Sequence, residues 1–182
     1  MTKLLLLLAL SAHAEPSCLA RVADRIAALR PSFPALDGLN IVLEPFESGA
    51  DFYQARPRSP WKIASERTYA VRVNTKVCAD APPAEAETAI LAHELSHLEA
   101  YSRLGRRGLL ALGWSYMVRP EGTEVEDFEK SADDEVVKRG MARGLAKYRE
   151  WVYARVSPEE AARKRRLYRT PEELLKSVPK NP

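Results

Sequence analysis

Two histidines and a glutamate are combined in the short segment His93-Glu94-Leu95-Ser96-His97. On a helix, residues four apart lie on one face, so both imidazoles can reach a single Zn²⁺ at about 2.0–2.1 Å. Glu94 cannot share the metal in the same geometry, but its carboxylate can take the proton of a metal-bound water. The segment therefore predicts a hydrolytic zinc site with Glu94 as general base.

The distribution of histidine supports this interpretation. The protein has three histidines, and His13 belongs to a segment that we expect to be removed. The remaining chain thus uses its histidines in this motif alone, which argues against a coincidental pair on an amphipathic helix. The apolar neighbours would bury the helix and exclude water from the site; they are Ile90, Leu91, Leu95 and Leu98.

A catalytic zinc site needs a third protein ligand and keeps its fourth position for water. An extended HExxHxxGxxH motif is excluded, because position 100 is alanine and position 103 is arginine. No histidine remains downstream, so the third ligand must be a carboxylate.

The acidic segment 126–133 is the best source of this carboxylate. Glu129 and Asp133 are four residues apart on an expected helix and share a face with Glu126. One carboxylate can bind the metal while another accepts a hydrogen bond from the second nitrogen of a ligand histidine. On this ground alone, the choice among the three stays open.

The two segments together resemble the gluzincin peptidases, in particular the CAAX-prenyl-protease-like and heat-shock membrane peptidase group and its small soluble relatives, the minigluzincins. The shared motifs are His93-Glu94-Leu95-Ser96-His97 and Glu129-Lys130-Ser131-Ala132-Asp133, within residues 84–140. The resemblance implies His93, His97 and Glu129 as ligands, Glu94 as general base, and Asp133 as the partner of a histidine. The chain departs from the membrane members in its short gap between the motifs and its lack of their transmembrane helices. ImmA/IrrE-like gluzincins share the short gap, but their intracellular role does not suit an exported chain.

Two further requirements of peptide hydrolysis are less well defined by the sequence. No histidine is left to stabilise the oxyanion, so a tyrosine or an arginine must do so; the candidates are Tyr101, Arg139, Arg143 and Tyr148. The alternating segment 69–77 reads as a half-exposed strand at a sheet edge, directly before the motif helix. We expect it either to bind the substrate backbone by β-augmentation or to be plain sheet structure.

The N-terminus predicts export. Lys3 precedes an apolar run over residues 4–10 and an Ala-x-Ala end at residues 12–14, as in a secretory signal peptide cleaved after Ala14. The run is too short to span a bilayer. We therefore expect residues 1–14 to be a signal peptide, and residues 15–182 to form a single secreted or periplasmic domain without a membrane span. In such an oxidising compartment Cys18 and Cys78 would form a disulfide.

The coarse pattern of the chain is helix, a few strands, and then helices. Residues 39–46 and 69–77 read as strands and residues 51–60 as a loop, while residues 109–118 read as a buried helix or the wall of a substrate groove. Helical spacing or helix-start signatures mark the rest: residues 17–29, 84–104, 124–140 and 141–156, Ser157-Pro158 and Thr170-Pro171. This order predicts an α+β, mainly helical zincin-like domain with a small sheet packed on the motif helix.

The sequence thus predicts a secreted or periplasmic zinc endopeptidase that acts on a peptide or protein substrate. The net charge of +3 is too small to suggest a nucleic-acid partner. The alternative is a catalytically silent, zinc-stabilised binding domain of the cell envelope. Glu94 argues against that alternative, because a structural metal site has no need of a base.

The basic segment 163–166 could also bind anionic surfaces, although a solvated helix face is its ordinary role.

Overall fold

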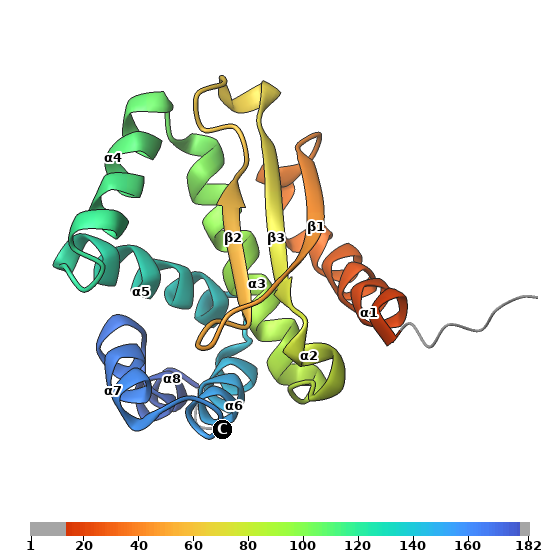
Figure 1. Cartoon of the computed structure of the whole chain (residues 1–182), viewed down its shortest axis with the longest axis vertical. Helices are drawn as coiled ribbons and strands as arrows, with labels where there is room; N and C mark the ends of the chain where they lie inside the picture. Colours follow the sequence, from red (N-terminus) through yellow and green to blue (C-terminus); the bar gives the residue numbers. More distant parts are fainter. Residues whose placement is uncertain (1–13, 179–182) are drawn as a thin grey trace, which may run out of the picture.

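The fold combines eight α-helices with one small sheet within residues 14–178, which are the residues that the computed structural model describes (Figure 1). The predicted α+β, mainly helical class is confirmed. The helices are α1 (Ala14–Leu29), α2 (Lys76–Ala79), α3 (Ala84–Arg103), α4 (Arg106–Val118), α5 (Thr123–Lys138), α6 (Ala142–Tyr153), α7 (Pro158–Leu167) and α8 (Pro171–Lys176). Short 3-10 turns are η1 (Arg30–Ser32), η2 (Pro34–Leu36) and η3 (Ala64–Glu66).

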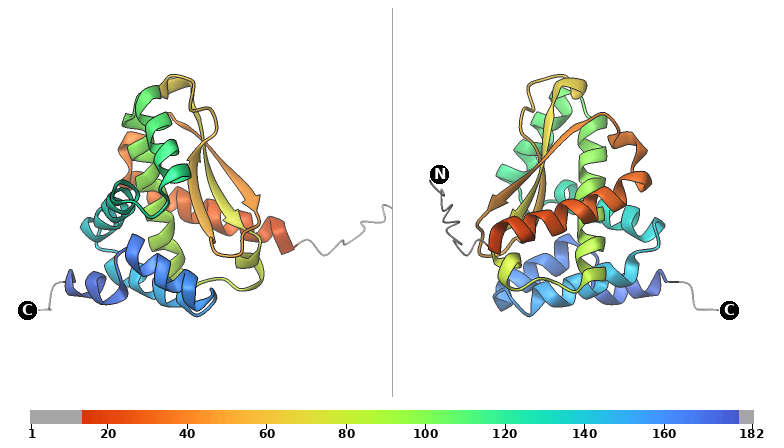
Figure 2. Two further views of the ribbon diagram at one scale, coloured as in Figure 1. Left: turned by 60° about the vertical axis from the view of Figure 1, so that its left-hand side comes forward. Right: turned by 90° about the vertical axis from the view of Figure 1, so that its right-hand side faces the viewer.

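The sheet has three strands: β1 (Asn40–Phe46), β2 (Tyr53–Pro57) and β3 (Thr68–Asn74), in the order β1-β3-β2. β1 pairs with β3 in parallel, and β2 pairs with β3 antiparallel. Helices α1 and α3 pack behind the sheet on one face, and β2 is the edge strand nearest to α4 and α5 (Figures 1 and 2).

Two predictions about the sheet are wrong. Residues 51–60 contain β2 instead of being a loop throughout, and β3 is the central strand instead of an edge strand. β2 is short and ends at Pro57, which an edge strand tolerates because one of its sides needs no ladder hydrogen bonds. Both faces of β3 are covered, since Tyr69 and Val71 on one face and Ala70 on the other are fully buried. Alternation along a strand indicated two different faces but could not show that both are covered.

The helix boundaries follow the local signals closely. The side chain of Ser157 accepts a hydrogen bond from the backbone of Glu160 at the start of α7. Thr170 and Glu173 form a reciprocal capping box at the start of α8. After α5 the chain turns at Gly140, whose φ of 76° favours glycine. These caps explain why the predicted helix starts and stops hold without tertiary information.

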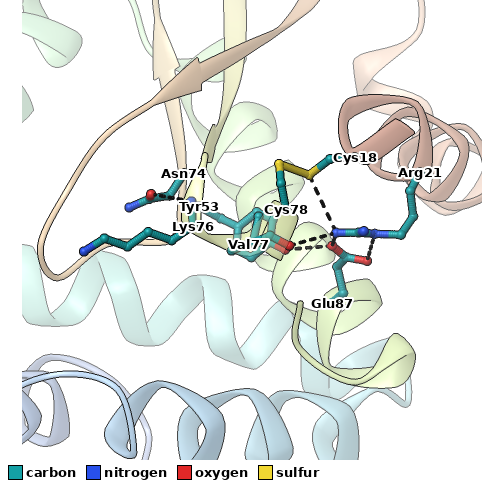
Figure 3. The surroundings of a disulfide bond; sticks show 8 residues. All are labelled: Cys18, Arg21, Tyr53, Asn74, Lys76, Val77, Cys78 and Glu87. Atoms are coloured by element: carbon teal, nitrogen blue, oxygen red, sulfur yellow. Dashed lines mark hydrogen bonds and ion pairs between the residues drawn. A yellow bond between two sulfur atoms is a disulfide. The ribbon is translucent and has the colours of Figure 1, made fainter. Parts of the chain in front are cut away.

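The predicted disulfide is present and joins α1 to α2. Cys18 and Cys78 are 60 residues apart in sequence, and their Cα atoms lie 5.2 Å apart. Beside the bond, the guanidinium of Arg21 forms an ion pair of 2.9 Å with the buried carboxylate of Glu87 on α3, as Figure 3 shows. Closing a loop of this length stabilises a fold by about 4 kcal/mol in the chain-entropy model. The disulfide thus fixes α1 to α2, and the ion pair holds α1 against the motif helix α3.

No helix within residues 14–178 is long and apolar enough to cross a membrane. The expected signal peptide falls almost entirely on residues 1–13, outside the described part of the chain.

Helix α3 forms the centre of the molecule, and α6 packs closely against it. A Cβ atom at Gly144 of α6 would lie 2.6 Å from the carbonyl oxygen of Glu85 and 3.0 Å from the Cβ of Ala89, both on α3. Contacts this short cannot be accommodated without moving one helix. Glycine at this position therefore sets the separation of α3 and α6.

Replacing Gly144 by alanine should lower the free energy of unfolding by about 1–3 kcal/mol, because the added methyl group overpacks the interface. Gly113 of α4 is the matched control, since nothing lies within 4 Å of a Cβ built there. Gly113→Ala should stabilise the protein by up to about 1 kcal/mol through helix propensity. Urea unfolding of both variants measures the difference, and equal effects would contradict the close packing of α3 and α6.

Candidate metal centre

The two histidines of the motif converge on one point. His93 and His97 lie one turn apart on α3, both are buried, and their Nε2 atoms are 3.0 Å from each other. The flanking residues Ile90, Leu91, Leu95 and Leu98 are buried in the core, as predicted, and fix this face of α3.

Glu129 of α5 completes the group. Its Oε2 atom lies 3.2 Å from Nε2 of His93 and 2.9 Å from Nε2 of His97. Glu126, the alternative in the sequence, instead forms an ion pair of 2.6 Å with Lys130 on its own helix. The structure thus brings Glu129, and not Glu126, to the two histidines.

The second oxygen of Glu129 is also held. The hydroxyl of Tyr116 on α4 donates a short hydrogen bond to Oε1, which leaves Oε2 directed at the histidines. Tyr116 was not singled out from the sequence, since it lies in a different helix and has no motif spacing to the ligands. It is a positioning residue for the carboxylate.

Asp133 is placed behind His93. Its Oδ1 atom lies 2.8 Å from Nδ1 of His93, so this carboxylate can fix the tautomer in which Nε2 carries a lone pair. Asp133 is fully buried and also receives the guanidinium of Arg149 at 2.7 Å and the backbone N–H of Arg169 at 2.8 Å. Burial by itself would raise the pKa of Asp133, but the charge of Arg149 and the contact with His93 hold it below its ordinary value. Neither arginine is marked by a sequence pattern, because both come from segments far from the motif.

His97 is oriented by packing. Its ring stacks on Phe128, with centroids 4.8 Å apart, and on Tyr101, with centroids 6.1 Å apart. Its Nδ1 atom has no hydrogen-bond partner among residues 14–178. The two histidines are thus held differently: the carboxylate of Asp133 contacts His93, and aromatic rings pack on His97.

The chemistry of the converging atoms fits a cation. Two imidazole nitrogens and a carboxylate oxygen lie within 4.8 Å of one another, and all three can offer lone pairs to the same point. Burial alone would lower the pKa of His93, yet its contacts with Asp133 and Glu129 raise it to about 9, so the pocket favours positive charge. Two nitrogens and one oxygen, with a position left for water, are a ligand set typical of zinc. The cluster could therefore hold a metal ion.

The carboxylate of Glu94 lies beside this cluster and forms no side-chain hydrogen bond within the described range 14–178. It is buried, and this burial raises its pKa above the ordinary value, although the neighbouring histidines oppose the shift. A carboxylate with a raised pKa and no fixed partner is suited to accept a proton.

A cavity of about 410 Å³ lies in front of these residues. We call it the cleft. His93, Glu94, His97 and Glu129 form its floor, and the whole of β2 forms one wall. The inner side of α4 also lines the cleft, with Leu109, Leu112 and Tyr116, and so does Tyr168, which follows α7.

Among the predicted oxyanion stabilisers, only Tyr101 lines the cleft. Arg139 is paired with Glu99 and Glu135, at 3.1 and 2.7 Å, and Arg143 is exposed on α6. Tyr148 packs in the core instead. Tyr168, which was not predicted from the sequence, also lines the cleft, and its ring lies 6.0 Å from that of His93.

A scan of protein-family models, a search of curated proteins and a search of solved structures each found no match to this chain.

The position of Glu129 leads to a direct test of the third ligand. Glu129→Gln should weaken zinc binding by more than the about 10–100-fold that results when a group supporting a ligand is lost. Glu126→Gln removes the same charge from the same helix and should leave the affinity unchanged. Competition with a fluorescent zinc chelator measures both variants, and equal losses would mean that Glu129 is not a ligand.

Proposed function

We propose that the protein is a zinc-dependent endopeptidase of the gluzincin type. The observation that carries this proposal is the position of Glu94 beside three converging atoms that could bind a metal, at the floor of an open cleft. Its carboxylate is buried and forms no side-chain hydrogen bond within residues 14–178. A metal that serves only to stabilise a fold is usually enclosed by four protein ligands and needs no free base next to it.

In this proposal His93, His97 and Glu129 hold the zinc ion. When bound, the ion supplies Lewis acidity, which polarises a peptide carbonyl and acidifies water. Glu94 accepts the proton of the attacking water at its carboxylate and passes it on to the leaving amine. Asp133 and Tyr116 keep His93 and Glu129 in position while the charges change.

The oxyanion that forms in the reaction needs a hydrogen-bond donor inside the cleft. Tyr101 and Tyr168 both line the cleft, and neither hydroxyl forms a hydrogen bond within residues 14–178. These two tyrosines are our candidates for the donor. The guanidinium of Arg149 lies 4.2 Å from the ring centroid of Tyr168 and contributes positive charge on the same side.

The free edge of β2 suits the backbone of an extended substrate. The backbone carbonyl of Phe52 accepts a hydrogen bond from the N–H of Asn74, and the backbone N–H of Arg58 donates one to the carbonyl of Thr68. In an antiparallel pair only every second residue bonds to the neighbouring strand, so the even-numbered residues of this segment form the hydrogen bonds to β3. The backbone groups of Tyr53 and Ala55 then point away from β3. Because β2 forms a wall of the cleft, a peptide could add there as a further strand beside the zinc site.

We also propose that the enzyme works outside the cytosol. The Cys18–Cys78 disulfide is compatible with an oxidising compartment, and the basic and apolar start of the chain has the pattern of a signal peptide.

Replacing Glu94 by glutamine tests the catalytic part of the proposal separately from the metal. The variant should bind zinc as the wild type does, but kcat/KM should fall by at least about 10²–10⁴-fold, because the proton acceptor is lost. A proteomic cleavage-site profile, with zinc content measured on the same samples, provides both readouts.

Glu85→Gln is the matched control, since it removes one charge from an exposed site on the same helix and should leave cleavage unchanged. If the zinc-loaded wild type cleaves nothing in a complex peptide mixture, the silent binding domain is the correct alternative. If Glu94→Gln cleaves as fast as the wild type, Glu94 is not the base.

A further inference from the structure

Helix α4 exposes a row of large apolar side chains on its outer side. Leu110, Trp114, Met117 and Val118 are 60%, 64%, 77% and 52% exposed. Their spacing of three and four residues places them on one helical face, which we call the α4 outer face. The predicted buried helix over residues 109–118 is therefore wrong, because Leu109 is the residue of α4 that is buried.

The alternative prediction, a groove wall, describes only the inner side of α4. Leu109, Leu112 and Tyr116 line the cleft. The outer face contributes neither to the core nor to the cleft within the described residues, and α4 stands at the margin of the molecule (Figure 1). A row of exposed apolar side chains of this size is typical of an interaction surface.

Unpaired positive charge borders the outer face. Arg106 and Arg107 precede Leu110 by four and three residues, so they lie on the same side of the helix, and Arg119 follows its end. All three are exposed and take part in no ion pair within residues 14–178. The helix itself contains no acidic residue.

A second exposed segment lies at the same end of the molecule. Trp61 and Ile63, in the connection between β2 and η3, are 65% and 56% exposed, and Lys62 between them is exposed as well. Arg67 ties this connection to the start of α4, because its guanidinium donates to the carbonyl of Leu104 at 2.7 Å. Figure 2 shows this connection beside the N-terminal end of α4.

We propose that the α4 outer face docks the protein on an anionic phospholipid bilayer, with the 61–63 segment beside it. Tryptophan and aliphatic side chains enter the interface between headgroups and acyl chains, while free arginines bind lipid phosphates. The charge next to the apolar row selects an anionic partner surface.

The C-terminal basic segment fits this role less well. In α7, Arg163, Lys164 and Arg166 are paired with Glu160, Asp51 and Glu121, at 2.5, 2.9 and 2.7 Å. Their charges are therefore neutralised within the fold, whereas Arg106, Arg107 and Arg119 have no ion-pair partner among the residues that the structure describes.

Docking through α4 would bring the cleft to the membrane surface, since the inner side of the same helix lines it. Polypeptides that lie on the bilayer or emerge from it would then reach the site before polypeptides in solution. The docking itself needs no peptidase activity and stands independently of the proposed reaction.

Fluorescence of Trp114 tests the proposal in the full chain. Trp61→Phe leaves Trp114 as the exposed tryptophan, because Trp151 is buried in the core. Vesicles of phosphatidylglycerol and brominated phosphatidylcholine should quench this emission, whereas vesicles of brominated phosphatidylcholine alone should quench it far less. This signal reports on α4 specifically, even if the apolar N-terminus also binds lipid.

Charge reversal tests the arginines. Arg106→Glu with Arg107→Glu should weaken partitioning of Trp114 into the anionic vesicles by at least about thirtyfold. Arg143→Glu with Lys176→Glu changes the net charge equally at other exposed positions and should weaken it by less than about threefold.

Three results would overturn the proposal. The first is that Trp114 is not quenched by anionic vesicles, and the second is that both charge-reversed pairs lose binding equally. The third is that the protein binds no vesicles and sediments as a dimer, which Leu110→Asp dissociates into monomers. That result would assign the α4 outer face to a second copy of the chain. Leu175→Asp, at an exposed leucine of α8, is the control for the apolar substitution.

Discussion

Three lone pairs held at one buried point are the constraint on which the rest of the structure depends. Nε2 of His93, Nε2 of His97 and Oε2 of Glu129 lie within 3.2 Å of one another. Buried acceptors in this arrangement repel each other unless a cation or a proton lies among them. The pKa of His93 is raised, and the two histidines hold the pKa of Glu129 low against the effect of burial. Both shifts indicate a site that favours positive charge.

The surrounding fold serves to keep these atoms together. The ion pairs of Glu87 hold α1 on α3, the disulfide fixes α1 to α2, and Gly144 lets α6 approach α3. From α6, Arg149 reaches Asp133, which supports His93 in turn. The geometry of this His-His-Glu cluster therefore depends on segments spread over most of the described chain. Helix α4 packs mainly on α5, lines the cleft with its inner side and leaves an apolar row exposed on its outer side.

Much of this arrangement could be predicted from local signals. Caps, apolar spacing and the HExxH pattern act within a few residues, so they defined the helices, the paired histidines and Glu94. The spacing of the second motif gave Glu129 and Asp133 but left Glu126 open, because all three share one helical face. Strand order, Tyr116 and Arg149 depend on contacts between distant segments, and no local pattern records them. The edge position was given to β3 instead of β2 for the same reason.

X-ray diffraction at the zinc absorption edge, on crystals of the protein grown with zinc, tests the metal centre most directly. The account predicts one anomalous peak at about 2.0–2.2 Å from the two Nε2 atoms and from a carboxylate oxygen of Glu129. No peak between these three residues, or zinc bound only at other sites, would contradict it.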